Sequence, residues 1–159
     1  MHAVDSALFR QVLGHFPTGV TIITAAGPDG PVGVSVAQFF SVSLEPLLVG
    51  FCATRGSSTW PVIREVGTFC VNVLADDQEL LCRRFSASGV DRFAEVTWEP
   101  SPAGSPRLDG ALAWIDAEVD QVHEAGDHDI CVARVVDLAI ARETGPLVWF
   151  RSGYHGLPG

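Results

Sequence analysis

Residues 111–138, ALAWIDAEVDQVHEAGDHDICVARVVDL, form the longest regular stretch of the sequence. In its first half, Ile115, Ala117 and Val119 occupy alternate positions, which is typical of a β-strand with one apolar and one polar face. The residues expected on the polar face are Asp116, Glu118 and Asp120. Because the turn residues Gly126-Asp127-His128 interrupt the pattern, the stretch predicts two long antiparallel strands joined by a hairpin.

The second half of this stretch repeats the alternation. Ile130, Val132, Val136 and Leu138 lie on alternate positions, which predicts that they form the inward row of the second strand. Arg134 falls in the same row. Because arginine is rarely buried without a partner, we expect one end of this strand to reach solvent or a subunit interface.

The rest of the sequence predicts shorter elements separated by Gly and Pro. Apolar residues at helical spacing, a proline in a first turn and the capping-box spacing of Asp76 and Glu79 indicate helices over 5–16, 57–67 and 76–85. Runs rich in β-branched or other apolar residues predict strands over 19–24, 32–40, 47–52, 68–74 and 146–150. Residues 86–107, rich in Ser, Pro and Gly, predict a long functional or mobile loop.

Six or seven strands with two or three short helices imply a mainly β fold, in which an antiparallel barrel carries helical inserts. At 159 residues, the chain is expected to form a single domain over 1–159. Apolar residues make up 47% and charged residues 18% of it. Since a small domain has too little volume to bury so many apolar side chains, we expect an obligate oligomer, most simply a two-fold dimer.

The charge balance narrows the classes of partner. The formal net charge is −9, and the sequence has no basic run. Nucleic acids and anionic membrane surfaces are therefore not expected ligands, because both require clustered cations. No apolar run approaches the roughly 20 residues of a membrane span, and the N-terminal residues do not resemble a signal peptide.

The four cysteines are Cys52, Cys70, Cys82 and Cys131, and no two of them have the spacing of a redox or zinc motif. Each lies among apolar residues, where a free thiol acts as a small buried hydrophobe. We therefore expect a reduced protein in the cytoplasm.

Three short segments carry polar residues suited to ligand contact. They are Pro17-Thr18-Gly19, Ser57-Ser58-Thr59 and Asp127-His128 in the hairpin turn. Hydroxyl and N–H groups at the start of a helix favour an anion such as phosphate, although on the residues alone Ser57 or Ser58 is more simply explained as an ordinary helix cap. Asp and Gly are also the usual hairpin residues, and a histidine beside them is often simply solvated.

Six motifs occur in an order that resembles the flavin reductase family, which has the FMN-binding split-barrel fold. They are Phe16-Pro17-Thr18-Gly19-Val20, Ser41-Val42-Ser43-Leu44-Glu45-Pro46, Phe69-Cys70-Val71-Asn72-Val73-Leu74, Asp91-Arg92-Phe93, Gly126-Asp127-His128 and Pro146-Leu147. The resemblance covers nearly the whole chain. Within the family, the sequence is most similar to the reductase components of two-component flavin-dependent monooxygenases.

The resemblance implies a homodimer with two flavin sites near its interface. It implies that FAD or FMN is reduced by NADH or NADPH and then passed to a separate monooxygenase. The nucleotides would carry the hydride chemistry, while the protein would stack the nicotinamide and flavin rings and supply electrostatics.

The resemblance also implies roles for particular residues. The backbone of Val36, Ala37 and Gln38 would run along the isoalloxazine, Ser57–Thr59 and Arg92 would bind phosphate, His128 would contact the nicotinamide as the catalytic residue, and Tyr154 would lie near the flavin. The further residues expected to bind the cofactors are Cys52, Ala53, Thr54, Ser86 and Phe93. No metal ligand is implied. Gln38, where the family more often has a small residue, and Leu47, where it often has proline, depart from the pattern and bear on the exact geometry of the site.

Three other readings remain open on the sequence alone. The first is a flavin-binding split barrel without turnover, and the second is a barrel that only binds another protein. The third is a metal site made by His123, Asp127, His128 and Asp129, although consecutive residues around a turn converge poorly on one ion. The shortage of Arg and Lys mildly disfavours NADPH, while the choice between FAD and FMN stays undecided.

Overall fold

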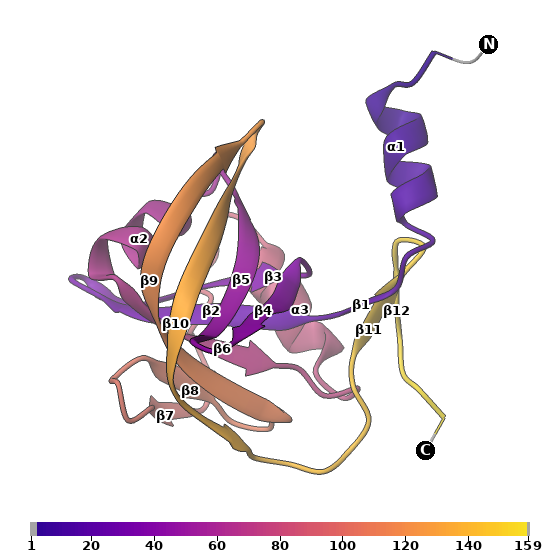
Figure 1. Ribbon diagram of the computed structural model, residues 1–159. Coiled ribbons are helices and arrows are strands. Elements are labelled where there is room, and N and C mark those ends of the chain that lie inside the picture. The colour runs from indigo at the N-terminus through magenta and orange to yellow at the C-terminus, as the bar shows by residue number, and fades with distance from the viewer. Residues whose placement is uncertain (1–2, 159) are drawn as a thin grey trace.

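The computed structural model describes residues 3–158 (Figure 1). Its helices are α1 (Ser6–Leu13), α2 (Trp60–Val66) and α3 (Glu79–Ser86). Its strands are β1 (Thr18–Gly19), β2 (Thr21–Gly27), β3 (Gly30–Val36), β4 (Phe39–Leu44), β5 (Leu47–Thr54), β6 (Thr68–Val73), β7 (Trp98–Pro100), β8 (Pro106–Leu108), β9 (Ala113–Ala125), β10 (His128–Ile140), β11 (Val148–Phe150) and β12 (Gly153–His155).

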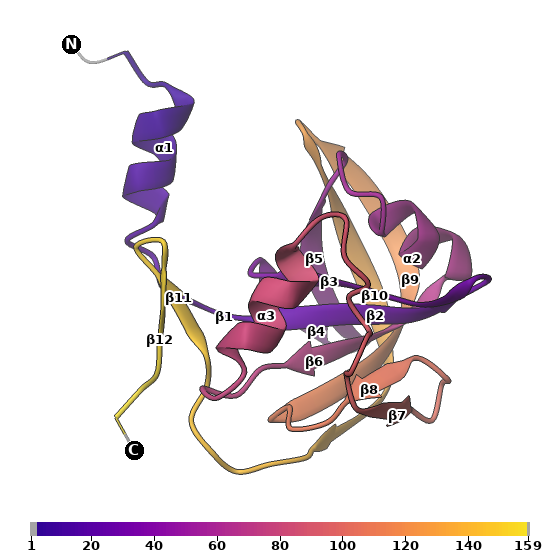
Figure 2. The ribbon, with the colours of Figure 1, turned by 180° about the vertical axis from the view of Figure 1, so that it is seen from behind.

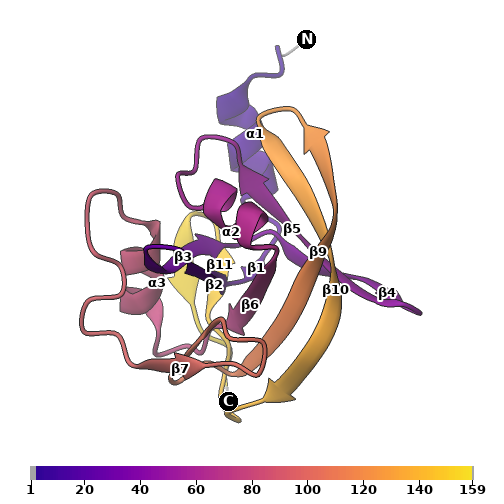
Figure 3. The ribbon, with the colours of Figure 1, turned by 90° about the vertical axis from the view of Figure 1, so that its left-hand side faces the viewer.

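The main sheet has seven strands in the order β3-β2-β6-β9-β10-β5-β4, with every neighbouring pair antiparallel. The prediction of a mainly β, antiparallel fold is therefore confirmed. Figure 3 shows β9 and β10 as two long, strongly curved ribbons on one side of the molecule. The strands β3 and β4 form the two edges of this sheet.

The core has two parts. In the first, Trp60 of α2 and Phe69 of β6 both meet Phe51 edge to face, at centroid distances of 5.4 and 5.2 Å. In the second, the buried ring of Phe85 from α3 packs with Leu74 and other apolar residues. In Figure 2, which views the molecule from the opposite side to Figure 1, α3 lies in front of β2 and β3, so this second cluster places the helix beside the sheet edge.

Helix α1 stands apart from the main sheet, at the end of the small sheet formed by β1, β11 and β12 (Figures 1 and 2). Asp5 caps it, because its carboxylate accepts a hydrogen bond of 2.8 Å from the Leu8 N–H. Its apolar side chains follow the predicted helical spacing, yet none of them is buried. No helix within residues 3–158 combines the length and the hydropathy that crossing a membrane requires.

The predicted inward row of the second long strand is wrong. The buried residues of β10 are Asp129, Cys131 and Ala133, so Ile130 and the alternate apolar residues after it face outward. Two register shifts between β9 and β10, at Val132/Ala133 and Val135/Asp137, disturb the alternation further. The prediction failed because it assumed that the row with the larger apolar residues faces the core, whereas in β10 this row lies on the outer face of the sheet.

The predicted exposure of Asp116 is also wrong, because this carboxylate is fully buried beside the β7–β8 hairpin. One of its oxygens accepts a hydrogen bond of 3.0 Å from the Ala103 N–H, while the other has no partner within residues 3–158. The hairpin begins inside residues 86–107, which the sequence predicts as loop throughout, and its second strand ends at Leu108.

Two boundaries also differ from prediction. The strand expected over 32–40 divides into β3 and β4, because the chain leaves one sheet edge at Ala37-Gln38 and joins the other. The capping box at Asp76 and Glu79 is absent. Gln78 is instead the N-cap of α3, and its side-chain oxygen accepts a hydrogen bond from the Ala75 N–H.

Candidate active site

A small pocket lies between the sheet edge at β3 and the end of β5. We call it the edge pocket; its volume is about 200 Å³. A hydrogen bond of 3.0 Å from the Cys52 N–H to the Gln38 carbonyl joins the two segments beside it. Because β2 is the one strand among residues 3–158 that pairs with β3, the other edge of β3 offers backbone donors and acceptors to a ligand. The pocket is lined by Val34, Ser35, Val36, Ala37, Gln38, Phe51, Cys52, Ala53, Thr54, Ser57, Trp60 and His128.

A second pocket has a volume of about 320 Å³, and we call it the loop pocket. Some of its lining residues directly follow or precede lining residues of the edge pocket in the sequence. Its walls are Pro31–Gly33, the turn residues Ser58 and Thr59, and the loop Ala87–Phe93. Residues Ser57 and Trp60, which flank the turn residues, line the edge pocket instead. The two pockets therefore lie on either side of the same Ser57–Trp60 turn.

A third pocket, the tail pocket, holds about 290 Å³ and is lined by Val20, Ser35, Ala37, Cys82, Ser86, Trp149 and Tyr154. The Tyr154 hydroxyl lies 3.3 Å from the Cys82 Sγ, and its ring meets Trp149 edge to face at 4.8 Å. Burial, together with the Cys82 thiol, raises the pKa of Tyr154 to about 12. The tail pocket shares Ser35 and Ala37 with the edge pocket.

The turn at Ser57–Thr59 is ordered by its own hydroxyl groups. Ser57 Oγ accepts hydrogen bonds from the N–H groups of Thr59 and Trp60, at 3.1 and 3.2 Å. The N-cap of α2 is Thr59, whose side chain forms no capping bond, and Ser57, two residues earlier, instead accepts from the N–H groups of the N-cap and of the first helical residue. Ser58 is exposed, while the Thr59 hydroxyl accepts a hydrogen bond from the guanidinium of Arg92 at 3.3 Å.

His128 begins β10 and borders the edge pocket with a half-exposed side chain. Its Nδ1 lies 2.7 Å from a carboxylate oxygen of Asp127. This contact with His128 lowers the pKa of the Asp127 carboxyl. A donated Nδ1–H leaves Nε2 as a hydrogen-bond acceptor toward a ligand.

The next residue, Asp129, is buried and connects this end of β10 to the Ser57–Trp60 turn. Its carboxylate accepts hydrogen bonds from Trp60 Nε1 at 2.8 Å and from Arg55 Nε at 3.2 Å. The bond from Trp60, with help from Arg55, lowers the pKa of Asp129. In addition, the Arg55 N–H donates to the Asp127 carbonyl at 3.0 Å. The two turns are therefore held in a fixed relative position.

All the residues predicted to bind cofactors line one of these three pockets. Eight line the edge pocket, four line the loop pocket, and Ser86 and Tyr154 line the tail pocket. Two residues that the sequence did not single out are Ser35, which borders two pockets, and Trp60, which carries the Asp129 bond. The position of Trp60 directly after the Ser-Ser-Thr segment was the available signal.

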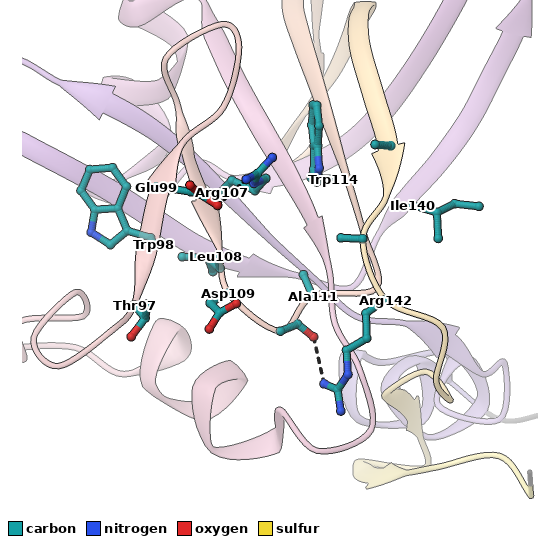
Figure 4. Close-up of a pocket in the computed structure, with 13 residues that line it drawn as sticks. Thr97, Trp98, Glu99, Arg107, Leu108, Asp109, Ala111, Trp114, Ile140 and Arg142 are labelled. Carbon is teal, nitrogen blue, oxygen red and sulfur yellow. Dashed lines mark hydrogen bonds and ion pairs between the residues drawn. The ribbon is translucent and has the colours of Figure 1, made fainter.

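A larger pocket of about 760 Å³ lies elsewhere, between the β7–β8 hairpin and the end of β10 (Figure 4). It contains none of the predicted residues. Arg107 pairs with Glu99 and lies over the Trp114 ring, and Arg142 pairs with Asp77 and donates to the Gly110 carbonyl. Because its cations are already paired, this pocket lacks the free charge that a phosphate ligand would need.

The four residues of the metal reading contact different groups. His123 Nε2 lies against Gln121, His128 against Asp127, and Asp129 against Trp60 and Arg55. Within residues 3–158, no group of three or more His, Cys, Asp or Glu side chains is arranged to hold an ion.

Comparison with known proteins agrees with this arrangement. Residues 13–158 match the model of the flavin reductase like domain. The chain is 47% identical over 155 residues to the HsaB reductase subunit of a flavin-dependent monooxygenase from Rhodococcus jostii RHA1, covering 98% of this chain and 80% of that protein. It is 38% identical over 159 residues to the FMN reductase (NADH) RutF of Klebsiella pneumoniae, covering 99% and 97%.

A solved structure gives the same result. The NADH:FAD oxidoreductase SgcE6 of Streptomyces globisporus C-1027, in complex with NAD and FAD fragments, superposes with a TM-score of 0.92. The two chains are 30% identical, and the match covers 99% of this chain and 98% of the other. The resemblance seen in the six sequence motifs is thereby confirmed, and the chain belongs to the flavin reductase family.

Proposed function

We propose that this protein is an NAD(P)H:flavin oxidoreductase, the reductase component of a two-component monooxygenase. It would reduce free FAD or FMN and pass the reduced flavin to a separate monooxygenase. The observation that carries this proposal is the edge pocket, where an edge strand, a hydroxyl-rich turn and His128 meet. Family membership and the names of the relatives support the same activity.

The residues around the edge pocket suit a flavin. The backbone at Val36–Gln38, where the chain leaves β3, would lie along the pyrimidine edge of an isoalloxazine, and the hydrogen bond from the Cys52 N–H to the Gln38 carbonyl holds it beside β5. The Ser57–Thr59 turn provides hydroxyl and N–H donors for a phosphate, and Arg92 provides the local positive charge. The remaining predicted residues, Cys52, Ala53, Thr54, Ser86, Phe93 and Tyr154, complete the walls.

The protein's contribution to the reaction is positioning. When both nucleotides are bound, they supply the chemistry, which is hydride transfer from the nicotinamide to the flavin. His128 would hold the nicotinamide carboxamide through Nε2, while Asp127 fixes the ring from the other side at Nδ1. Asp129 keeps this strand end in place beside the turn through Trp60 and Arg55.

The test is the loss of NADH and NADPH absorbance with FAD or FMN as acceptor, in all four combinations. Turnover that depends on added flavin supports the proposal and ranks the cofactors. A folded protein that binds flavin without turnover in any combination would instead be a flavin-binding protein. The variant His128→Ala is expected to lower the rate about 10- to 100-fold while the Kd for flavin stays the same.

We further propose a homodimeric split barrel. Large apolar side chains are exposed on α1, on β4 and along the outer face of β10, including Phe9 at 59%, Leu44 at 88% and Ile140 at 74%. Such a surface favours a partner, and a second copy of this chain supplies a matching one. Helix α1, which buries no residue on its own chain, would pack against that copy.

Sedimentation of the purified protein tests the dimer. The substitution Leu138→Glu, on the outer face of β10, is expected to yield monomers. Leu80→Glu on α3 is the control, since Leu80 is 81% exposed and lies outside these three surfaces. Equal behaviour of the two variants would count against the proposed interface. Because all four cysteines are free, the cytoplasm is the proposed location.

A further inference from the structure

Most polar side chains of the edge pocket are already engaged with other parts of the protein. Those that form hydrogen bonds within the chain are Ser35, Thr54, Ser57 and Trp60. The thiol of Cys52 also borders the pocket, but a thiol is a weak donor and a weak acceptor. Beyond these side chains, the strong hydrogen-bonding groups that remain are Nε2 of His128 and the side-chain amide of Gln38, which forms no hydrogen bond within residues 3–158.

Gln38 lies where the chain crosses from β3 to β4, and its backbone is fixed there. Its carbonyl accepts a hydrogen bond of 3.0 Å from the Cys52 N–H, and the next residue, Phe39, pairs with Phe51 of β5. The residue itself is exposed and lines the edge pocket. A ligand that meets this amide therefore has to order only its side-chain torsions, because the backbone is already in place.

Gln38 and His128 lie on opposite sides of β5. Thr54 pairs with His128 on one side of this strand, while Cys52, two residues earlier, bonds to Gln38 on the other. Two strand spacings of about 4.8 Å and two residues of about 3.3 Å each place the two backbones roughly 12 Å apart. Since both residues line the same pocket of about 200 Å³, there is room for one planar ring between the amide and the imidazole.

A nicotinamide carboxamide needs two kinds of partner, because its NH2 group donates and its carbonyl accepts. When Nδ1 of His128 donates to Asp127, Nε2 is an acceptor, so His128 satisfies the NH2 group alone. The carbonyl still requires a donor, since an acceptor that leaves water without a partner weakens binding. The NH2 group of Gln38 is a donor of the right kind on the other side of the pocket.

We propose that Gln38 determines specificity for the nicotinamide by donating a hydrogen bond from its side-chain amide to the carboxamide carbonyl. This inference rests on the proposed function, in which His128 holds the same carboxamide through Nε2. The two residues would bind the two ends of one group from opposite sides of β5. They would thereby fix the rotation of the nicotinamide ring, and with it the direction of the carbon that gives up the hydride.

Two analogues of NADH test the two ends of the carboxamide separately. Reduced thionicotinamide adenine dinucleotide has sulfur, a weaker acceptor, in place of the carbonyl oxygen. Reduced 3-acetylpyridine adenine dinucleotide has a methyl group in place of the NH2 group. For each protein, kcat/KM with each analogue is divided by kcat/KM with NADH, with FMN as the acceptor throughout. Differences in intrinsic reactivity between the dinucleotides then cancel when a variant is compared with the wild-type protein.

Gln38→Met removes the amide at nearly constant length. It is expected to lower kcat/KM for NADH about 3- to 10-fold, the size of one neutral hydrogen bond, and to leave kcat/KM for the thio analogue almost unchanged. The ratio for the acetyl analogue is expected to change only with His128→Ala. Gln38→Glu keeps an acceptor but loses the donor, so it is expected to be at least as impaired as Gln38→Met. The control is Gln121→Met, at an exposed residue of β9 outside the pocket, which is expected to match the wild-type protein.

The N3–H and C4=O groups of an isoalloxazine form a similar amide edge, so a second pair of substrates separates this source. Riboflavin and 3-methylriboflavin, whose N3 carries a methyl group, are compared as acceptors with NADH. The ratio of their rates is expected to be the same for Gln38→Met and for the wild-type protein. If the variant changes this ratio and leaves both dinucleotide ratios unchanged, Gln38 reads the flavin, and the proposal is overturned.

Three other results would also overturn the proposal. They are an unchanged kcat/KM for NADH in Gln38→Met, an equal loss with NADH and the thio analogue, which a general disturbance of the pocket would cause, and full activity of Gln38→Glu. The proposed function is judged separately, because it fails only if the wild-type protein does not reduce any flavin.

Discussion

Gly33 offers a sharp test of how tightly the candidate site is packed. A Cβ added at this residue would lie 2.7 Å from Phe85 Cε1, 3.0 Å from Phe85 Cδ1 and 3.2 Å from the Thr24 methyl group. Both neighbours are fully buried, and the Phe85 ring is also held by Phe93. Neither can move aside without disturbing the second core cluster, so Gly33→Ala must strain β3 or displace α3.

The size of the effect follows from this contact. Forcing an extra methyl group into a packed core costs about 1–3 kcal/mol. A loss of that size lowers the folding equilibrium constant roughly 5- to 150-fold, at about 1.4 kcal/mol for each factor of ten. For a chain of this length, the melting temperature is then expected to fall by about 2–12 °C.

Gly19→Ala is the matched control. Gly19 also lies in a strand and has no left-handed φ, but a Cβ there meets nothing within 4 Å. Replacing such a glycine restricts the unfolded chain, so stability is expected to stay the same or rise by up to about 1 kcal/mol.

Urea unfolding, followed by tryptophan fluorescence, measures both variants. The midpoint is expected to fall for Gly33→Ala with an unchanged m-value, because the surface exposed on unfolding is the same. If Gly33→Ala and Gly19→Ala give the same midpoint, the argument that a rigid Phe85 ring enforces glycine here is refuted.

Three further predictions concern the ionisable groups and the loop. Because the pKa of Asp129 is lowered in the folded state, its contribution to stability is present above its ordinary pKa and is lost as the pH falls through the lowered value. Trp60→Phe removes the first cause of that shift, so acid unfolding followed by circular dichroism is expected to begin at a higher pH; an unchanged midpoint would contradict the role of this bond. Tyr154 is the only tyrosine, and its tyrosinate absorbance is expected near pH 12 in the folded protein but near pH 10 in denaturant; equal midpoints would contradict its burial. Phe93→Ala, which removes the ring that anchors the loop on Phe85, is expected to cost about 2–4 kcal/mol and to speed proteolysis within residues 86–95; an unchanged cleavage rate would contradict the anchoring.

The elements with local signals were predicted well. The strand expected over 68–74 is β6 (Thr68–Val73), and the helix expected over 57–67 contains α2, which Gly67 ends with a left-handed φ of 83°. A proline in the first turn and a glycine at the end are properties of a few adjacent residues, so sequence alone can reveal them.

The orientation of β10 could not be predicted in the same way. Its outer row is as apolar as its inner row, because Cys131 and Ala133 fill the core while Ile130 and Val132 face outward. Periodicity shows that two faces differ, but it does not show which of them lies against the core. The register shifts with β9 depend on the partner strand as well.

In the candidate site, too, features set by adjacent residues were predictable, and contacts between distant residues were not. The resemblance named residues that line three neighbouring pockets, but it did not indicate what connects them. The bond from Arg92 to Gly33 joins residues 59 positions apart, and the bond from Trp60 to Asp129 joins residues 69 positions apart. Contacts at such separations leave no pattern in a single sequence, and their roles became visible only in the folded chain.

The free edge of β3 also bears on how this protein stays in solution before any ligand binds. An unpaired strand edge is a template on which a strand of another molecule can add, and this leads to aggregation. In this chain Pro31 removes one donor from that edge, and Arg92 occupies the Gly33 carbonyl. The same arginine that prepares the edge for a small molecule would therefore also deter a passing β-strand, so that ligand recognition and resistance to aggregation depend on one side chain.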